Sequence, residues 1–144
     1  MLVFPGAAGW DTSIPGRVRE GATVVFESAA GFGDAEFFEE QRAGLEAAFR
    51  LFIERPVEVW TDAGRPRYVD LLWPDPVKIR DFSSLVAVRG GETIGRLGRL
   101  PVAALHRVGT GCFVFLGSAI GPALWSGDKQ AHTWLSSVAQ ATRA

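Results

Sequence analysis

Five side chains in this sequence have both suitable chemistry and a suitable position for binding a ligand: Trp10, Asp11, Glu27, Ser28 and Ser118. Each follows an apolar run that is predicted to be a strand. In open α/β folds, ligands bind in the loops at the carboxyl ends of such strands. A neighbouring Trp and Asp can hold a sugar by stacking and hydrogen bonding. We therefore take these five residues as the candidate ligand-binding site.

Structural roles compete with this hypothesis. Glu27 can accept backbone N–H groups in the turn that follows its strand, and Asp11 can cap the next helix while Trp10 packs over the end of the sheet. Ser118 is the one hydroxyl of the glycine-rich loop 117–122, and that loop contains no acid, base or metal ligand. The sequence therefore indicates no catalytic residue.

Three short apolar runs bounded by glycine or proline are predicted to be strands that position these groups: Leu2–Phe4, Ala22–Phe26 and Cys112–Leu116. We expect the first of them to be buried. Capping residues and apolar stripes at helical spacing predict the helices. These are a short helix capped by Thr12 or Ser13 that runs to about Glu20, a long helix from Ala35 to about Phe52 capped by Asp34, and a last helix from Ser126 or Asp128 to about Thr142.

Between these elements the middle of the chain consists of short stretches separated by Gly or Pro turns. The stretches are Val57–Trp60, Tyr68–Trp73, Val77–Phe82, Leu85–Val88, Glu92–Arg96 and Pro101–Arg107. Because no helix separates them, we expect antiparallel additions to the sheet. In one stretch, Val77, Ile79 and Asp81 fall on the same face.

Composition excludes several classes of protein. The net charge is −1 and no basic run occurs, so nucleic-acid binding is not expected. The single cysteine, Cys112, excludes an internal disulfide, and His106 and His132 lack the spacing of metal ligands, so we expect no metal and no cofactor. No apolar run approaches the length of about 18 residues that a membrane span needs. The sequence thus predicts a cytoplasmic protein.

Two segments carry a family resemblance. Leu2-Val-Phe-Pro-Gly6, a short helix and then Val18-Arg-Glu-Gly-Ala-Thr-Val-Val-Phe-Glu27 resemble class I glutamine amidotransferase-like domains. The strand pair from Leu100 to Gly117, with its Gly-x-Gly turn, is similar to that of non-catalytic members such as the trimerisation domain of β-galactosidases. The resemblance covers residues 1–33 and 100–140. It implies a single shortened α/β domain over residues 1–144, a three-layer sandwich whose partly parallel, flavodoxin-like sheet has antiparallel extension strands.

The departures from this family bear on function. Active amidotransferases place a Cys nucleophile after the strand that here ends at Phe26, where this chain has Glu27 and Ser28. Their His and Glu follow the late strand, where this chain has the loop 117–122. A thiol cannot be activated without that machinery, so the resemblance implies a non-catalytic domain with a structural or self-association role. The alternative is a domain that binds a small molecule such as a carbohydrate, or an enzyme, with its site around Glu27 and Ser118.

The family has about two β-α units ahead of the strand that Leu2–Phe4 resembles. Without them a strand edge and apolar surface are left uncovered. The resemblance therefore implies a homo-oligomer such as a dimer, or a partner chain, that covers the edge near Leu2–Phe4. The expected apolar interface includes this strand and the segment Trp125–Trp134. Alternatively, the chain is a fragment of a longer gene product.

Overall fold

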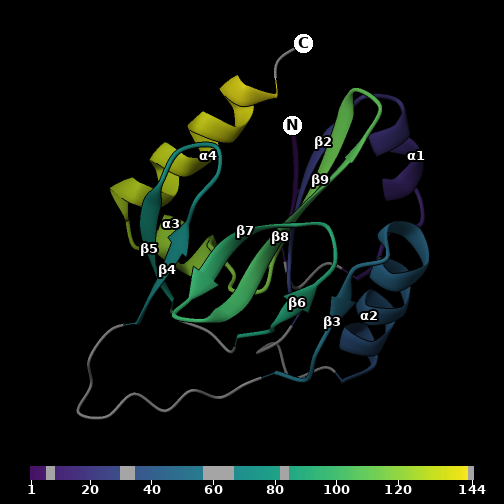
Figure 1. Ribbon diagram of the computed structural model, residues 1–144, viewed down its shortest axis with the longest axis horizontal. Helices are drawn as coiled ribbons and strands as arrows, with labels where there is room; N and C mark the ends of the chain where they lie inside the picture. Colours follow the sequence, from purple (N-terminus) through teal and green to yellow (C-terminus); the bar gives the residue numbers. More distant parts are fainter. Residues whose placement is uncertain (6–8, 30–34, 57–66, 82–84, 143–144) are drawn as a thin grey trace.

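The computed structural model describes residues 1–5, 9–29, 35–56, 67–81 and 85–142 (Figure 1). These residues form a mixed α/β fold with a curled, seven-stranded mixed sheet in the order β1-β2-β9-β8-β7-β4-β5. The strands of this sheet, in that order, are Leu2–Phe4, Thr23–Glu27, Gly111–Leu116, Leu100–Val108, Glu92–Leu97, Arg67–Leu71 and Val77–Asp81. A separate two-stranded ribbon pairs β3 (Phe52–Ile53) with β6 (Val88–Arg89).

The first part of the sheet is parallel. β1 pairs with β2, and β2 pairs with β9, in parallel register. Every residue of β2 and β9 is buried, as the continuous apolar runs predict for strands that are covered on both faces. The expectation for β1 was wrong, because this strand lies at the edge of the sheet and Val3 is 43% exposed.

The remaining strands are antiparallel, which confirms the expectation for the middle of the chain. β9 pairs with β8, β8 with β7, β7 with β4 and β4 with β5. In β5 the buried residues alternate with exposed ones, so Ile79 and Asp81 face the interior while Lys78 and Arg80 face outward. The interior face of β5 thus carries a carboxylate as well as apolar groups.

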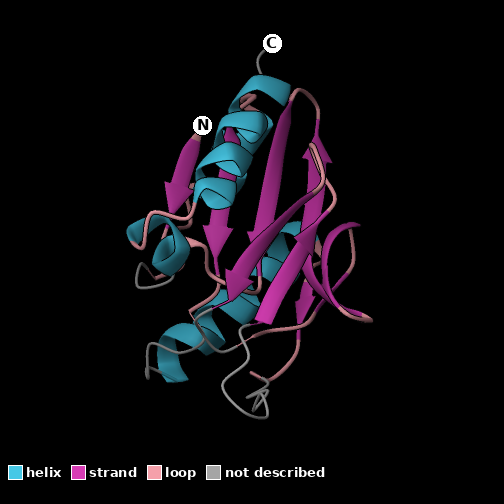
Figure 2. Ribbon diagram, turned by 90° about the vertical axis from the view of Figure 1, so that its left-hand side faces the viewer, coloured by secondary structure: helices cyan, strands magenta, loops and turns pink. Residues whose placement is uncertain are grey.

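Four helices cover the two faces of the sheet in the described ranges. α1 (Ile14–Arg19) and α2 (Ala35–Phe49) pack on one face, where Val18, Leu45 and Phe26 share an apolar core. α3 (Gly121–Trp125) and α4 (Lys129–Ala141) cover the other face, and Figure 2 shows α4 lying across the strands. There the indole of Trp134 is buried and donates a 2.8 Å hydrogen bond to the carbonyl of Trp73.

Local boundaries differ from the expectations in several places. α2 ends at Phe49 and not at Phe52, because Arg50 adopts a φ of 52° and the Leu51 amide donates back to the Leu45 carbonyl. Phe52 then belongs to β3. Of the predicted stretch Leu85–Val88, only its last residue lies in strand β6.

The predicted caps and one further predicted strand can be compared with the structure only in part. Asp128 caps α4, as predicted, with its carboxylate accepting from the Gln130 amide. The predicted cap Asp34 and the predicted strand Val57–Trp60 lie outside the described residues.

Candidate functional site

Glu27 is the last residue of β2 and is only 3% exposed. One oxygen of its carboxylate, Oε1, accepts a 2.9 Å hydrogen bond from the amide of Gly121, the first residue of α3. Side chains alternate along a strand, so Glu27 faces the α3 side while Phe26 faces α1 and α2. The carboxylate therefore joins the end of β2 to the loop after β9.

Ser118 lies in that loop, beside a second buried carboxylate. Its hydroxyl donates a 2.6 Å hydrogen bond to Oδ1 of Asp81, at the end of β5. Arg67, at the start of β4, forms an ion pair with Oδ2 of the same carboxylate. The Asp81 side chain has no exposed surface, and a buried carboxylate persists only where such partners offset its lost hydration. This network ties together three segments that are distant in the sequence.

Ser28 and Gln41 fix the chain just after β2. The Ser28 amide donates to the Leu116 carbonyl at 2.9 Å, which extends the pairing of β2 with β9 by one residue. Gln41 is fully buried within α2, where Oε1 accepts from the Ala29 amide at 2.8 Å and Nε2 donates to the Glu27 carbonyl at 3.3 Å. The helix thus supplies partners for backbone groups on both sides of Ser28.

The structure brings Glu27, Ser28 and Ser118 to one end of the sheet but places the other two candidates elsewhere. Trp10 packs edge-on against the rings of Phe26, Phe49 and Phe113, on the α2 face. Asp11 accepts a 2.8 Å hydrogen bond from the Ser13 amide just before α1.

Hydrogen bonding to Ser13 lowers the pKa of the Asp11 carboxyl. This geometry gives Asp11 a structural function at the start of α1. The edge contacts of Trp10 likewise place its ring against other aromatic side chains.

A small cavity lies beside Ser118, lined by Leu71, Ile79 and Leu116 among others. Its volume is about 10 Å³, which corresponds to about one water molecule. A sugar ring does not fit into this cavity. The polar side chains around it form hydrogen bonds and an ion pair with one another and with the backbone. Such contacts hold segments of the chain together.

Metal ligands and a reactive thiol are two further possibilities. Among the described residues, no three His, Cys, Asp or Glu side chains converge as metal ligands. Cys112 is buried in β9 next to the Thr23 hydroxyl, and burial raises the pKa of its thiol. A thiol with a raised pKa is a poor nucleophile at neutral pH.

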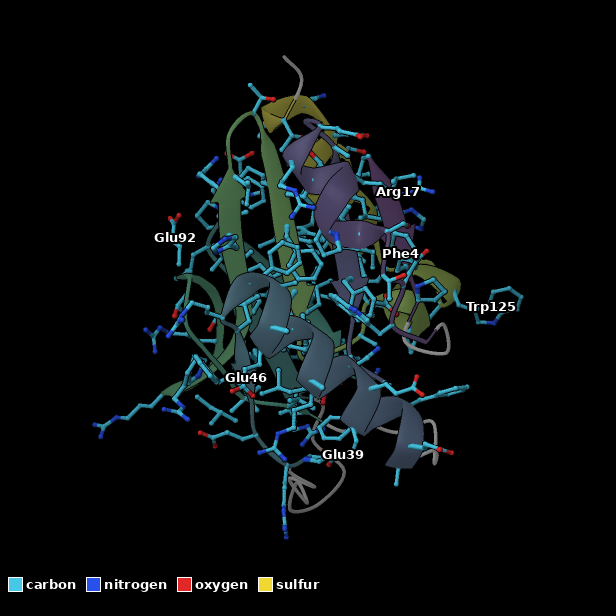
Figure 3. All side chains as sticks on the ribbon, turned by 90° about the vertical axis from the view of Figure 1, so that its right-hand side faces the viewer. Phe4, Arg17, Glu39, Glu46, Glu92 and Trp125 are labelled. Carbon is cyan, nitrogen blue, oxygen red and sulfur yellow. The ribbon has the colours of Figure 1, made fainter. Side chains whose placement is uncertain are left out.

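Exposed apolar side chains occur at the open side of β1 and at the end of α3. Val3 faces the same way as its register partner Val25, towards the face that α3 and α4 cover. Met1 is 52% exposed and Trp125, at the end of α3, is 95% exposed. In Figure 3, Trp125 projects away from the ribbon on the side where Phe4 lies. We call Met1 and Val3 together with the unpaired side of β1 the β1 edge surface.

Trp134 was also expected in an apolar interface, and here the expectation was wrong. Its side chain has no exposed surface because it lies in the core between α4 and the sheet. Of the two tryptophans that bound that segment, only Trp125 is exposed.

Three residues of the polar network were not identified from the sequence. Asp81 could have been identified, because it lies on the apolar face of an alternating stretch. A buried acid at such a position needs a hydrogen-bonding partner. Nothing in the sequence around Arg67 indicates its role, since only the pairing of β4 with β5 brings it next to Asp81. Nothing indicates the role of Gln41 either, because a glutamine in a helix is ordinarily solvated.

Comparison with known proteins provides a fold but no family. No family model and no curated protein matches the chain. Among solved structures, it is similar to the exo-β-1,4-mannosidase Op5Man5 from Opitutaceae bacterium strain TAV5, with 16% identity, a TM-score of 0.58 and coverage of 93% of this chain and 24% of that one. It is also similar to the β-galactosidase from Bacillus circulans sp. alkalophilus, with 13% identity, a TM-score of 0.55 and coverage of 81% and 20%.

The chain therefore spans about a quarter or less of these two glycosidases. Neither is a glutamine amidotransferase, and only the β-galactosidase side of the sequence resemblance agrees with them. At such identities the likeness concerns the fold alone. None of the described helices is long and apolar enough to cross a membrane.

Proposed function

We propose that this chain is a non-catalytic accessory domain of a carbohydrate-active protein, with a structural or self-association role. The two similar glycosidases support the carbohydrate class. Within that role we regard the domain as a shortened relative of the amidotransferase-like fold, with β1, β2 and β9 as the remaining parallel strands of a three-layer, flavodoxin-like sandwich.

The observation that carries the proposal is the β1 edge surface. β1 has a strand neighbour only on its β2 side in the described residues, and its sequence Leu2-Val3-Phe4 contains no charge. Natural edge strands are usually protected by lysine, by bulges or by a covering element. An uncharged edge strand with an exposed apolar side chain, here Val3 at 43%, is typical of an interface. We propose that a second copy of the chain covers it, forming a dimer.

The polar network at the strand ends supports the non-catalytic part of the proposal. Glu27, Asp81 and Gln41 each bond to neighbouring segments of the chain itself. The bond to the Gly121 amide gives Glu27 a structural role, and its side chain is only 3% exposed, whereas a general acid or base must reach its substrate.

The test replaces one apolar residue by lysine at two matched exposed strand positions. Val3→Lys puts a charge on the β1 edge surface, while Tyr68→Lys puts one on the outward face of β4. We expect light scattering to give the wild type and Tyr68→Lys the mass of an assembly and Val3→Lys the mass of one chain. Equal masses for Val3→Lys and the wild type would overturn the assignment of the interface to β1.

A second candidate function is carbohydrate binding at the strand ends around Glu27, Ser28 and Ser118. It is favoured by the glycosidase neighbours and by the convergence of these side chains. A thermal-shift panel of sugars and nucleotides tests it, with Glu27→Gln compared against the exposed Glu20→Gln. A shift that Glu27→Gln removes and Glu20→Gln keeps supports this candidate, and a panel without any shift rules against it.

We further propose a cytoplasmic location. The single cysteine of the sequence is a free thiol buried in β9, which fits a reducing compartment. Fractionation of the cells that make the protein tests this proposal: recovery in the cytosolic fraction supports it, and recovery outside that fraction overturns it.

A further inference from the structure

A row of alternating charge crosses three strands on the outward face of the curled sheet. Asp70 of β4 is the register partner of Lys78 on β5 and of Arg96 on β7. Residues that lie directly opposite each other in antiparallel strands present their side chains on the same face. The Lys78 ammonium lies 3.8 Å from the Asp70 carboxylate, and Arg96 donates to the carbonyl of Arg99 in the β7–β8 turn.

This row borders a surface groove with a volume of about 590 Å³. Its lining combines the three charged residues with apolar side chains from the β4–β5 hairpin and with one amide from α4: Asp70, Leu71, Leu72, Pro76, Val77, Lys78, Arg96, Gly98 and Gln130. Leu72 is 51% exposed, so the groove presents apolar surface to solvent. Small-molecule sites commonly have volumes of about 300–1,000 Å³. We call this feature the hairpin groove.

We propose that the hairpin groove binds a neutral saccharide; this inference rests on the proposed carbohydrate role and assigns it a site away from the strand ends. A sugar hydroxyl both donates and accepts hydrogen bonds. Asp70 accepts, while Lys78, Arg96 and the Gln130 amide donate, so neighbouring hydroxyls of one ring meet alternating partners. The C–H face of the ring packs on Leu72 and the apolar wall of the hairpin.

The charge pattern argues against two other ligands. A carboxylate that approaches Lys78 and Arg96 also meets Asp70, which lies between them and repels it. An apolar peptide segment would bury the charged row without supplying partners for it, which is costly. A polar, uncharged and polyhydroxylated ligand satisfies the row and uses the apolar wall as well.

The test is an amide NMR titration of the full chain with β-1,4-mannobiose and with a β-galactoside, each up to about 100 mM because an open groove favours weak binding. Galacturonate serves as the charged comparison and glycerol as the polyol that lacks a ring. We expect saturable shifts at Asp70, Leu72 and Arg96 with a neutral saccharide and none with glycerol.

Two matched variants assign the effect to the groove. Arg96→Gln removes a charged donor and is expected to weaken binding by about ten-fold or more. Arg99→Gln changes an exposed neighbour that is not part of the lining, keeps the carbonyl that Arg96 contacts, and is expected to bind like the wild type.

Four outcomes overturn the groove proposal: no saturable shift with either neutral saccharide, shifts confined to Glu27 and Gly121, equal losses in both variants, or tighter binding of galacturonate. None of them alters the mass measured for Val3→Lys, so failure of the groove is distinguishable from failure of the assembly role.

Discussion

The Ser118 hydroxyl donates a 2.6 Å hydrogen bond to Oδ1 of Asp81, a residue 37 positions earlier in the chain. The two residues belong to the parallel and the antiparallel parts of the sheet, since Ser118 follows β9 and Asp81 ends β5. Arg67 binds the other carboxylate oxygen. The bond therefore helps to close the curl of the sheet, and Ser118 contributes to the fold through it.

Substitution within this network should lower the free energy of unfolding in a graded way. Ser118→Ala removes one hydrogen bond to a charged group and should cost about 1.5–3 kcal/mol. Asp81→Asn leaves the largely buried Arg67 without its charge partner and should cost about 3–5 kcal/mol. Urea denaturation measures both. Asp70→Asn disrupts the exposed pair with Lys78 and should cost less than about 1 kcal/mol, and an equal loss in all three variants would contradict this account.

The fully buried Gln41 should be among the most sensitive polar positions. Gln41→Ala leaves the Ala29 amide and the Glu27 carbonyl without the partners that the helix supplies, which should cost about 2–4 kcal/mol. The matched control is Gln140→Ala, on the exposed side of α4, which should change stability by less than about 0.5 kcal/mol. Similar denaturation midpoints for the two variants would show that Gln41 contributes no net stability.

Glu27 offers a local test of its structural role through hydrogen exchange. Glu27→Ala removes the acceptor of the Gly121 amide, so exchange at Gly121 should become faster. Glu27→Gln retains an oxygen at this position and should preserve most of the protection. If Gly121 exchanges at the wild-type rate in Glu27→Ala, the carboxylate does not hold α3 in place.

Asp11 should contribute to the pH dependence of stability. Hydrogen bonds from Ser13 lower the pKa of this carboxyl in the folded state. Its contribution is therefore present above the unfolded carboxyl pKa of about 3.9 and is lost as the pH falls through the lower folded value.

Thermal unfolding of Asp11→Ala measured from pH 6 to pH 2 should accordingly show a shallower loss of stability on acidification. The exposed Asp75→Ala provides the control at the β4–β5 turn. A wild-type slope in Asp11→Ala would contradict the assignment.

The fold was predictable where burial alone determines a strand. β2 and β9 correspond to largely apolar runs that each follow a glycine, and the structure forms both strands and buries them. Their parallel pairing was not predicted from the sequence. The position of β1 was not predictable from its own three residues, because Leu2-Val3-Phe4 suits a central strand as well as an edge strand. The end of α2 was also missed, since Phe52 continues the helical spacing and only the backbone of Arg50 interrupts it.

The candidate site was predictable only in part, because most of its contacts join segments that are distant in the sequence. Glu27 and Ser118 were identified from their places after two strands. Their actual partners, Gly121 and Asp81, depend on how the sheet curls, and no local pattern encodes that. Trp10 was chosen for its ring and its position in a loop, but aromatic packing against Phe26 and Phe113 takes it to the opposite face.

Sedimentation equilibrium of the wild-type chain tests the central claim most directly. An uncharged strand edge that exposes Val3 should bring two chains together, so the measured mass should rise above the 15.5 kDa of one chain as the concentration increases from about 1 to 100 µM. A mass that stays at 15.5 kDa over this whole range would contradict the proposal that the β1 edge surface is an assembly interface.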